Sequence, residues 1–281
     1  MIVFLNGQFV PEAQATVSVF DRSFLYGDGL FETMRVANGK PFRWTQHLER
    51  LERGAEFLGL SIPFTRAALG GFAQELIRQN QMPESLLRLT LSRGVGVRGY
   101  SPKGADKPVL VISQHAFSGP ASEAPLRWRA RTASFRLPAG EALAQFKTCN
   151  KLAQVLARAE AEAAGADEAL LLNTEGYVVE GASSNLFWIE CGAVCTPALT
   201  SGILAGVTRE VVRELCSKLG LSYREASARL TDLEQVDAAF LSLSSHGIIE
   251  LTAINGTKLG SSALIAELHT AYGKLVRTEC A

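Results

Sequence analysis

The amino-acid sequence predicts a mixed α/β (α+β) protein built of two domains. Its 281 residues exceed the roughly 150 residues of an average domain, so two domains are expected. Strand-like and helix-like hydrophobic patterns follow one another irregularly in both halves, without a regular βαβ alternation. Between the halves, residues 118–125 (SGPASEAP) are poor in bulky apolar side chains and predict a linker. The expected domains are therefore residues 1–117 and 126–281.

The first domain is predicted to begin with a hairpin and to contain two long helices. Asn6-Gly7 lies between two apolar runs, residues 2–5 and 8–10, and both residue types tolerate the positive φ angles of a type I′ turn. Leucine and alanine recur at helical spacing from residue 48 to residue 58, which predicts a helix. The helices are expected at residues 45–60 and 65–81, and the further strands at residues 30–36, 86–92 and 108–113.

The second domain is predicted to restart the alternation after the linker. A turn is expected at residues 173–176 (NTEG), since asparagine and glycine favour turns. The expected strands are residues 128–132, 168–172, 186–190, 193–196, 238–242 and 253–255, and the expected helices are residues 152–164, 208–220 and 262–276.

Composition excludes several classes of protein. Lys plus Arg and Asp plus Glu each number 28, so the chain lacks the basic excess expected of nucleic-acid or anionic-membrane binding. Apolar residues make up 47% and charged residues 20%, which is typical of a globular protein with a large core. No apolar run is long enough for a membrane span, and the N-terminus lacks the pattern of a signal peptide.

The five cysteines predict a reducing, cytoplasmic setting. Their number is odd and their spacing is irregular, which is not a disulfide framework. Cys191 and Cys195 lack a second Cys or His pair nearby to complete a zinc site, so we expect ordinary thiols and no metal. The four histidines also lack metal-ligand spacing and are interpreted as structural or surface residues. A G-x-G-x-x-G run at residues 94–99 is not followed by a helix pattern and is interpreted as a loop.

A helix start after two glycines is the first candidate binding feature. In residues 201–213 (SGILAGVTREVVR), the first helical amides lack intrahelical acceptors, and the helix dipole favours an anion there. Gly206 would let a ligand approach the backbone, so a phosphate on the amides of Val207 and Thr208 is a natural interpretation. The alternative is a simple helix cap at Thr208.

Two titratable residues lie in apolar or junction segments. Glu180 follows strand-like residues in VVEGASSNL (178–186), where an acid needs a cationic or hydrogen-bonding partner, although a solvated turn is the alternative. Lys147 lies between an apolar segment and a helix start. Desolvation in a pocket would lower the pKa of such a lysine and make it a usable nucleophile, although a surface lysine is the alternative.

Taken together, these segments resemble the class IV aminotransferase family, also called fold-type IV pyridoxal phosphate (PLP) enzymes. The resemblance extends over nearly the whole chain, in order and spacing. It rests on Asp21-Arg22, YGDGLFETMRV (26–36), HLERLERGAEFLGL (47–60), SRGVGVRGYSP (92–102), KTCNKLAQVL from Lys147, DEALLLNTEGYVVEGASSNLF (167–187) and LAGVTRE (204–210).

The resemblance implies PLP as cofactor and a role for each matching residue. Lys147 matches the lysine that forms the Schiff base and moves the substrate proton. Glu180 matches the carboxylate that keeps the pyridine nitrogen protonated, so that the ring can act as an electron sink. The other implied cofactor contacts are Arg50, Ser244 and the amides of Val207 and Thr208 on the phosphate, and Leu204 on the ring face. The implied architecture places the active site between two domains, near the partner subunit of a homodimer.

Within the family, the sequence is most similar to aminodeoxychorismate lyases, which form 4-aminobenzoate and pyruvate. RGVGVRGYSP and Thr33 in LFETMRV carry this similarity. In that reading Lys147 removes the Cα proton, and aromatisation of the ring drives the loss of pyruvate. Arg98 would hold a substrate carboxylate, because a guanidinium matches a carboxylate in two bonds. Phe31 and Thr33 are the other expected substrate contacts.

Two alternatives remain open. The first is an amino-acid transaminase of the D-amino-acid or branched-chain type. The D-amino-acid enzymes share the GDG stretch and an arginine in the loop of Arg98, whereas a branched-chain enzyme would more often have glycine at the position of Thr33. The segment from His246 to Glu250 matches none of these groups. The second alternative is a non-catalytic PLP-binding protein, against which the retained Lys147, Glu180 and Arg50 argue.

Overall fold

The computed structural model describes residues 1–117 and 124–281, which form two compact units. Residues 1–117, Phe146–Lys151 and Val276–Ala281 belong to the first unit, and residues 124–145 and Leu152–Leu275 to the second. The second unit therefore differs from the expected domain 126–281, because two short segments of that range belong to the first unit. The backbone of residues 147–149 pairs with a strand of the first sheet, which explains one of them. Residues 118–123 of the expected linker lie outside the described residues.

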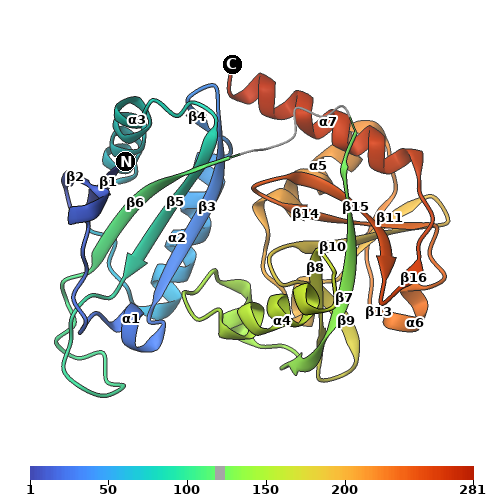
Figure 1. The fold of residues 1–281 in the computed structure, drawn as a ribbon, viewed down its shortest axis with the longest axis horizontal. Helices are drawn as coiled ribbons and strands as arrows, with labels where there is room; N and C mark the ends of the chain where they lie inside the picture. The colour runs from blue at the N-terminus through green and yellow to red at the C-terminus, as the bar shows by residue number, and fades with distance from the viewer. Residues whose placement is uncertain (118–123) are drawn as a thin grey trace. The chain divides into compact units, whose positions relative to one another are not determined.

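The first unit is built on a six-stranded antiparallel sheet in the order β2-β1-β6-β5-β3-β4 (Figure 1). The strands are β1 Ile2–Leu5, β2 Gln8–Pro11, β3 Gly29–Ala37, β4 Lys40–Pro41, β5 Ser85–Ser92 and β6 Val109–Ala116. The helices are α1 Arg22–Tyr26, α2 Trp44–Leu58 and α3 Arg66–Asn80, with a 3-10 turn, η1, at Glu12–Gln14.

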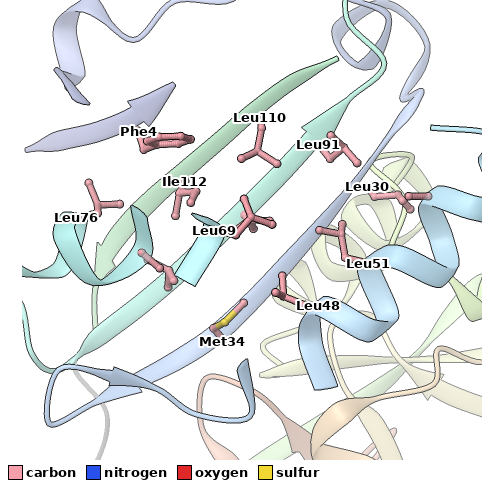
Figure 2. Packing of buried hydrophobic residues seen from close by; sticks show 14 of the residues in the cluster. Phe4, Leu30, Met34, Leu48, Leu51, Leu69, Leu76, Leu91, Leu110 and Ile112 are labelled. Carbon is pink, nitrogen blue, oxygen red and sulfur yellow. The ribbon is translucent and has the colours of Figure 1, made fainter. Parts of the chain in front are cut away.

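The core of this unit lies between one face of the sheet and helices α2 and α3 (Figure 2). Side chains alternate along β3, because successive residues of a strand point to opposite faces. Leu30 and Met34 lie in the core with Leu51 of α2. Phe31 and Thr33 therefore point to the other face of the sheet, away from the helix layer.

The elements expected in the first half are confirmed, with no end shifted by more than three residues. Helix α1 was not expected. It spans only five residues, too few for a hydrophobic period. It begins because the Asp21 carboxylate accepts hydrogen bonds from the amides of Ser23 and Phe24, which is a standard N-cap arrangement.

The second unit contains a ten-stranded mixed sheet in the order β12-β11-β10-β14-β15-β7-β8-β9-β13, with β16 paired to β15. Its strands are β7 Leu126–Leu137, β8 Glu168–Asn173, β9 Tyr177–Gly181, β10 Asn185–Glu190, β11 Ala193–Thr196, β12 Tyr223–Glu225, β13 Ala228–Arg229, β14 Ala238–Leu243, β15 Gly247–Ile254 and β16 Thr257–Lys258. Its helices are α4 Leu152–Ala163, α5 Val207–Leu219, α6 Leu230–Leu233 and the greater part of α7 Ala263–Glu279, with 3-10 turns η2 Ala142–Gln145 and η3 Leu199–Ser201.

Both faces of this sheet are apolar, and β8 shows it most clearly. Leu170 and Leu172 join one hydrophobic cluster, whereas Ala169 and Leu171 join another that includes Ala157 of α4. All six residues of β8 are consequently buried. The sequence of such a strand is a continuous apolar run, without alternation of apolar and polar residues.

The expected helices and most expected strands of the second half are present, and the mixed α+β class is confirmed. One strand prediction was wrong in extent: the strand expected at residues 253–255 begins at Gly247. All its residues except Thr252 are buried, so no alternation marks its start. Strand β7 is also longer than expected and contains a register shift between Thr132 and Arg136. Among the described residues, no helix combines the length and apolarity needed to cross a membrane.

Candidate active site

Lys147 is held against the first sheet by its backbone. Its carbonyl accepts a hydrogen bond from the amide of Phe31 at 2.9 Å, and the amide of Cys149 donates to the carbonyl of Gly29 at 2.8 Å. The segment therefore extends the pairing of β3 by a short irregular strand. The side chain is half-buried, and its Nζ lies 4.5 Å from the centroid of the Phe31 ring. This arrangement fixes the amine beside the face of β3 that points away from the helices.

Arg50 of α2 is buried in a cluster that sequence reasoning did not find. The Arg50 Nε and Nη2 donate to Glu32 Oε1 and Oε2 of β3 at 2.8 and 2.6 Å. His47 Nδ1 lies 2.7 Å from the same Oε2. Because Glu32 accepts two hydrogen bonds from Arg50, the orientation of the guanidinium is fixed by β3, the strand next to Lys147. The expected phosphate contact of Arg50 remains a prediction.

The charges of this cluster balance. Burial raises the pKa of the Glu32 carboxyl, but the Arg50 charge and hydrogen bonds from Arg50 and His47 outweigh it and hold that pKa at about 2. Burial lowers the pKa of His47, and the hydrogen bond to Glu32 only partly opposes this. At neutral pH the cluster therefore holds one carboxylate, one guanidinium and a neutral imidazole that donates through Nδ1.

Phe31 and Thr33 share their face of the sheet with an arginine that was not predicted as a site residue. Thr33 of β3 is the register partner of Arg88 of β5, so the two side chains point the same way. The Arg88 guanidinium lies 3.9 Å from the Phe31 ring centroid. Burial lowers the pKa of Arg88. No carboxylate among residues 1–117 and 124–281 pairs with it.

Arg98 lies in the loop between β5 and β6 and is exposed. Within the described parts of the chain, no hydrogen bond, ion pair or ring contact joins Arg98 to Phe31, Thr33 or Lys147. The structure therefore does not bring this predicted substrate contact together with the other two. The G-x-G-x-x-G run at residues 94–99 is part of the same loop, and no helix opens after it, as expected.

In the second unit, Glu180 and Asn185 hold the backbone of Leu204. Glu180, 8% exposed at the end of β9, accepts a hydrogen bond from the Leu204 amide at 3.0 Å. The Asn185 Nδ2 of β10 donates to the Leu204 carbonyl at 3.0 Å. Strand pairing places Glu180 opposite Asn185. Asn185 was not predicted as a site residue, because turn asparagines look the same in sequence.

The helix start at which we expect an anion to bind is present at α5. The N-cap is Gly206, which has no side chain to cap the helix, so Val207 and Thr208 are the first two helical residues. The alternative of a cap at Thr208 was therefore wrong. The Thr208 Oγ1 lies 3.5 Å from the Ser244 Oγ in the turn between β14 and β15. Two hydroxyls and open helix amides thus gather within one unit, an arrangement suited to a phosphate.

A buried carboxylate supports the short connection between β9 and β10. Glu168 of β8 is fully buried and accepts hydrogen bonds from the hydroxyls of Ser183 and Ser184 at 2.7 and 3.2 Å. The Gly181 amide donates to the Ser184 carbonyl at 2.7 Å. The sequence EGASSN therefore folds as a tight turn that brings Glu180 and Asn185 to opposite sides of Leu204.

Replacing Gly206 with alanine should weaken anion binding at α5. A Cβ at this position would lie 1.9 Å from the Asn185 Oδ1, so Asn185 must move and release the Leu204 carbonyl. We expect Gly206→Ala to weaken the dissociation constant for PLP about 10-fold or more, as measured by absorbance titration of the apoprotein. Gly71→Ala, where no atom lies within 4 Å of the added Cβ, is the control. Unchanged PLP binding in Gly206→Ala would argue against this site.

The predicted site residues thus fall into two groups. The first unit carries Phe31, Thr33, Arg50, Arg98 and Lys147, and the second carries Glu180, Leu204, Val207, Thr208 and Ser244. Within the described residues, no group of three or more His, Cys, Asp or Glu side chains could hold a metal ion.

Comparisons with known proteins agree with this architecture. The sequence profile of the family described as "Amino-transferase class IV" matches residues 29–254. A protein from Methanocaldococcus jannaschii, provisionally named a branched-chain-amino-acid aminotransferase, is 37% identical over 91% of this chain and 88% of its own length. The aminodeoxychorismate lyase of Vibrio harveyi is 34% identical over 86% of this chain and 89% of its own length.

A solved structure shows the same fold. The branched-chain aminotransferase from Thermoproteus uzoniensis, crystallised with norvaline, matches with a TM-score of 0.92 and 30% identity, over 99% of this chain and 96% of that one. The profile match covers far more than half of the chain, and the fold agrees along nearly its whole length. The chain therefore belongs to the class IV aminotransferase family.

Proposed function

We propose that this chain is a PLP-dependent aminodeoxychorismate lyase, which converts 4-amino-4-deoxychorismate into 4-aminobenzoate and pyruvate. The observation that carries the proposal is Arg88, a half-buried guanidinium with no carboxylate partner among the described residues, beside Phe31 and Thr33 on the sheet face next to Lys147. A half-buried cation of this kind is stabilised by a bound anion, and aminodeoxychorismate carries two carboxylates.

Each unit separately carries groups that suit PLP. Gly206 leaves the start of α5 open, since a Cβ there would meet the Asn185 side chain, and Thr208 and Ser244 add hydroxyls for the phosphate. Glu180 supplies the buried carboxylate that a pyridinium nitrogen needs. Leu204, held at both backbone groups, supplies an apolar side chain for the ring face. When bound, PLP withdraws electrons from the substrate Cα and so makes its proton acidic.

Lys147 is the residue that would hold the cofactor and move the Cα proton. Its amine lies over the Phe31 ring, and its backbone is tied to β3, so its position is set by the sheet rather than by a loose loop.

Arg88 would bind one substrate carboxylate and Arg98 the other. Arg88 can reach a group lying over Phe31 and Thr33. Arg98 is exposed in its loop, which suits a contact completed in a homodimer, the assembly we propose. The five free cysteines agree with a cytoplasmic setting.

A transaminase is the second candidate, and two observations favour it. The M. jannaschii relative is named for that activity. In addition, Arg88 would equally fit the distal carboxylate of a dicarboxylic amino acid or keto acid. A non-catalytic PLP-binding protein remains the remote alternative.

One pair of assays separates lyase from transaminase. The holoenzyme is given aminodeoxychorismate, and pyruvate and 4-aminobenzoate are measured. It is then given D-alanine, L-leucine or glutamate with a keto acid, and amino transfer is measured. We expect pyruvate and 4-aminobenzoate in equal amounts. Amino transfer without pyruvate from aminodeoxychorismate would replace the lyase proposal with the second candidate.

Removing the Arg88 charge should selectively lower kcat/KM for a substrate that has a second carboxylate. We expect Arg88→Met to lower kcat/KM for aminodeoxychorismate about 10- to 100-fold, because a charge-assisted hydrogen bond is lost. The visible absorption of the bound cofactor should not change. Arg78→Met, at an exposed position paired with Glu75, is the control. Unchanged kcat/KM in Arg88→Met would show that Arg88 does not bind substrate.

A further inference from the structure

A buried arginine holds the loop that carries Arg98. Arg22 of α1 is only 4% exposed. Its Nη1 donates to the carbonyls of Gly99 and Ser101 at 2.9 and 3.1 Å, and its Nη2 donates to that of Tyr100 at 3.0 Å. Three consecutive carbonyls of an irregular loop are therefore bound by one planar guanidinium. A lysine could not reproduce this geometry, since its single ammonium cannot form such a fork.

The direction of Arg22 is set by Asp28. The Arg22 Nε donates to Asp28 Oδ2 at 2.8 Å, and Arg93 Nε donates to the same oxygen at 2.8 Å. Arg93 is in turn held by the carbonyls of Leu58 and Gly59. Burial raises the pKa of Asp28, but hydrogen bonds and charges from Arg93 and Arg22 lower it below its ordinary value. Asp28 is therefore ionised at neutral pH and links the Arg22 fork to the end of α2.

Helix α1 also holds the beginning of the loop. The Arg22 amide donates to the Gly94 carbonyl at 2.9 Å, and the Gly99 amide donates to the Tyr26 hydroxyl at 3.3 Å. The loop is thus attached to α1 at both Gly94 and Gly99. Arg98 comes directly before the second attachment, and its own side chain is exposed.

We propose that Arg22 is a positioning residue that presents Arg98 to the substrate carboxylate. This inference rests on the substrate role of Arg98 given under Proposed function. A loop with three glycines in six residues loses much conformational freedom when it is ordered. The hydrogen bonds from Arg22 order the loop when the protein folds, so substrate binding does not have to order it. A substitution at Arg22 should therefore change catalysis only by changing the position of Arg98.

A double-mutant cycle tests this coupling. We expect Arg22→Lys to raise KM for aminodeoxychorismate about 10-fold, with kcat within about twofold and the cofactor absorption unchanged. Arg98→Ala should raise KM to a similar extent. In the Arg98→Ala background, Arg22→Lys should have almost no further effect, because the residue through which it acts is gone. Arg78→Lys, an exposed arginine in an ion pair, is the matched control.

Two outcomes would overturn the proposal. One is an equal rise in KM from Arg22→Lys in the presence and absence of Arg98, which would show an effect on the fold alone. The other is a fall in kcat with unchanged KM. Should Arg22→Lys not fold, Tyr26→Phe removes only the hydroxyl that accepts from Gly99. It should give a smaller rise in KM with the same dependence on Arg98.

Amide hydrogen exchange separates this proposal from the proposed function. We expect the amides of residues 94–101 to exchange about 10-fold or more faster in Arg22→Lys than in the parent protein. This readout needs no substrate. Faster exchange in a protein without lyase activity would retain the loop clamp and reject the lyase, and KM would then be measured with the amino acid that the protein does transaminate. Unchanged exchange would reject the clamp whatever the reaction.

Discussion

Lys147→Ala should abolish turnover and the visible Schiff-base absorption band of the purified holoenzyme. The amine is the only group in our proposal that both holds the cofactor and moves the Cα proton. Loss of general acid–base catalysis alone costs about 10²- to 10⁴-fold in rate, and loss of the covalent attachment adds to it. We expect a fall in kcat of at least about 10⁴-fold. Absorbance spectra and product assays of the parent and variant proteins check this.

The control for this variant is Lys218→Ala, at an exposed position in the last turn of α5. It should keep both band and turnover. Borohydride should bleach the band of the parent and of the control by reducing the Schiff base. A band that persists in Lys147→Ala would show that another lysine carries the cofactor. Loss of turnover with an intact, reducible band would also contradict the assignment.

Glu32→Gln should give the largest loss of stability. The substitution leaves the Arg50 guanidinium buried without its carboxylate, and breaking a buried ion pair from one side costs about 3–5 kcal/mol. A glutamine keeps only one acceptor oxygen, so it cannot accept all the hydrogen bonds that Glu32 takes from Arg50 and His47. Urea unfolding of the apoprotein at pH 7, followed by circular dichroism, should show this decrease in the free energy of unfolding.

The loss of stability in Glu32→Gln should depend on pH. The pKa of Glu32 falls from its ordinary 4.5 to about 2 on folding. The carboxylate therefore stabilises the fold fully above about pH 4.5, and this contribution, about 3 kcal/mol, is lost as the pH falls toward 2. The difference between parent and variant should shrink over that range. Glu75→Gln, in an exposed pair with Arg78, should change little at any pH. A difference that is constant with pH would mean that Glu32 is not ionised in the folded protein.

Local patterns predicted most of the helices and strands, including strands that are buried on both faces, such as β8. Helix α2 has a clear apolar stripe, and the expected helix matches it within two residues. Nearly all residues of strand β15 are buried, and no alternation marks its start at Gly247. Helix α1 depends on the capping carboxylate of Asp21 instead of a hydrophobic period.

In the site, residues within recognisable segments could be predicted, whereas those whose role depends on partners distant in the sequence could not. Lys147 and Glu180 stand in recognisable segments, whereas the environment of Arg50 depends on Glu32, 18 residues away on a neighbouring strand. Arg88 looked like the polar face of an alternating strand. Only the register with Thr33 and the nearby Phe31 ring show what it faces. Arg22 binds backbone carbonyls, which every residue type has, so the sequence does not show these partners.

The chain path around Lys147 has a consequence for anyone who divides the gene. Because Phe146–Lys151 belongs to the first unit while the chain on either side belongs to the second, neither half is a continuous stretch of sequence. A fragment that stops at residue 117 would keep β3 but lack the segment that pairs with it. The complementary fragment would carry Lys147 without the sheet that supports it. Fusions, split reporters and domain exchanges should therefore keep residues 29–31 and 147–149 from the same parent.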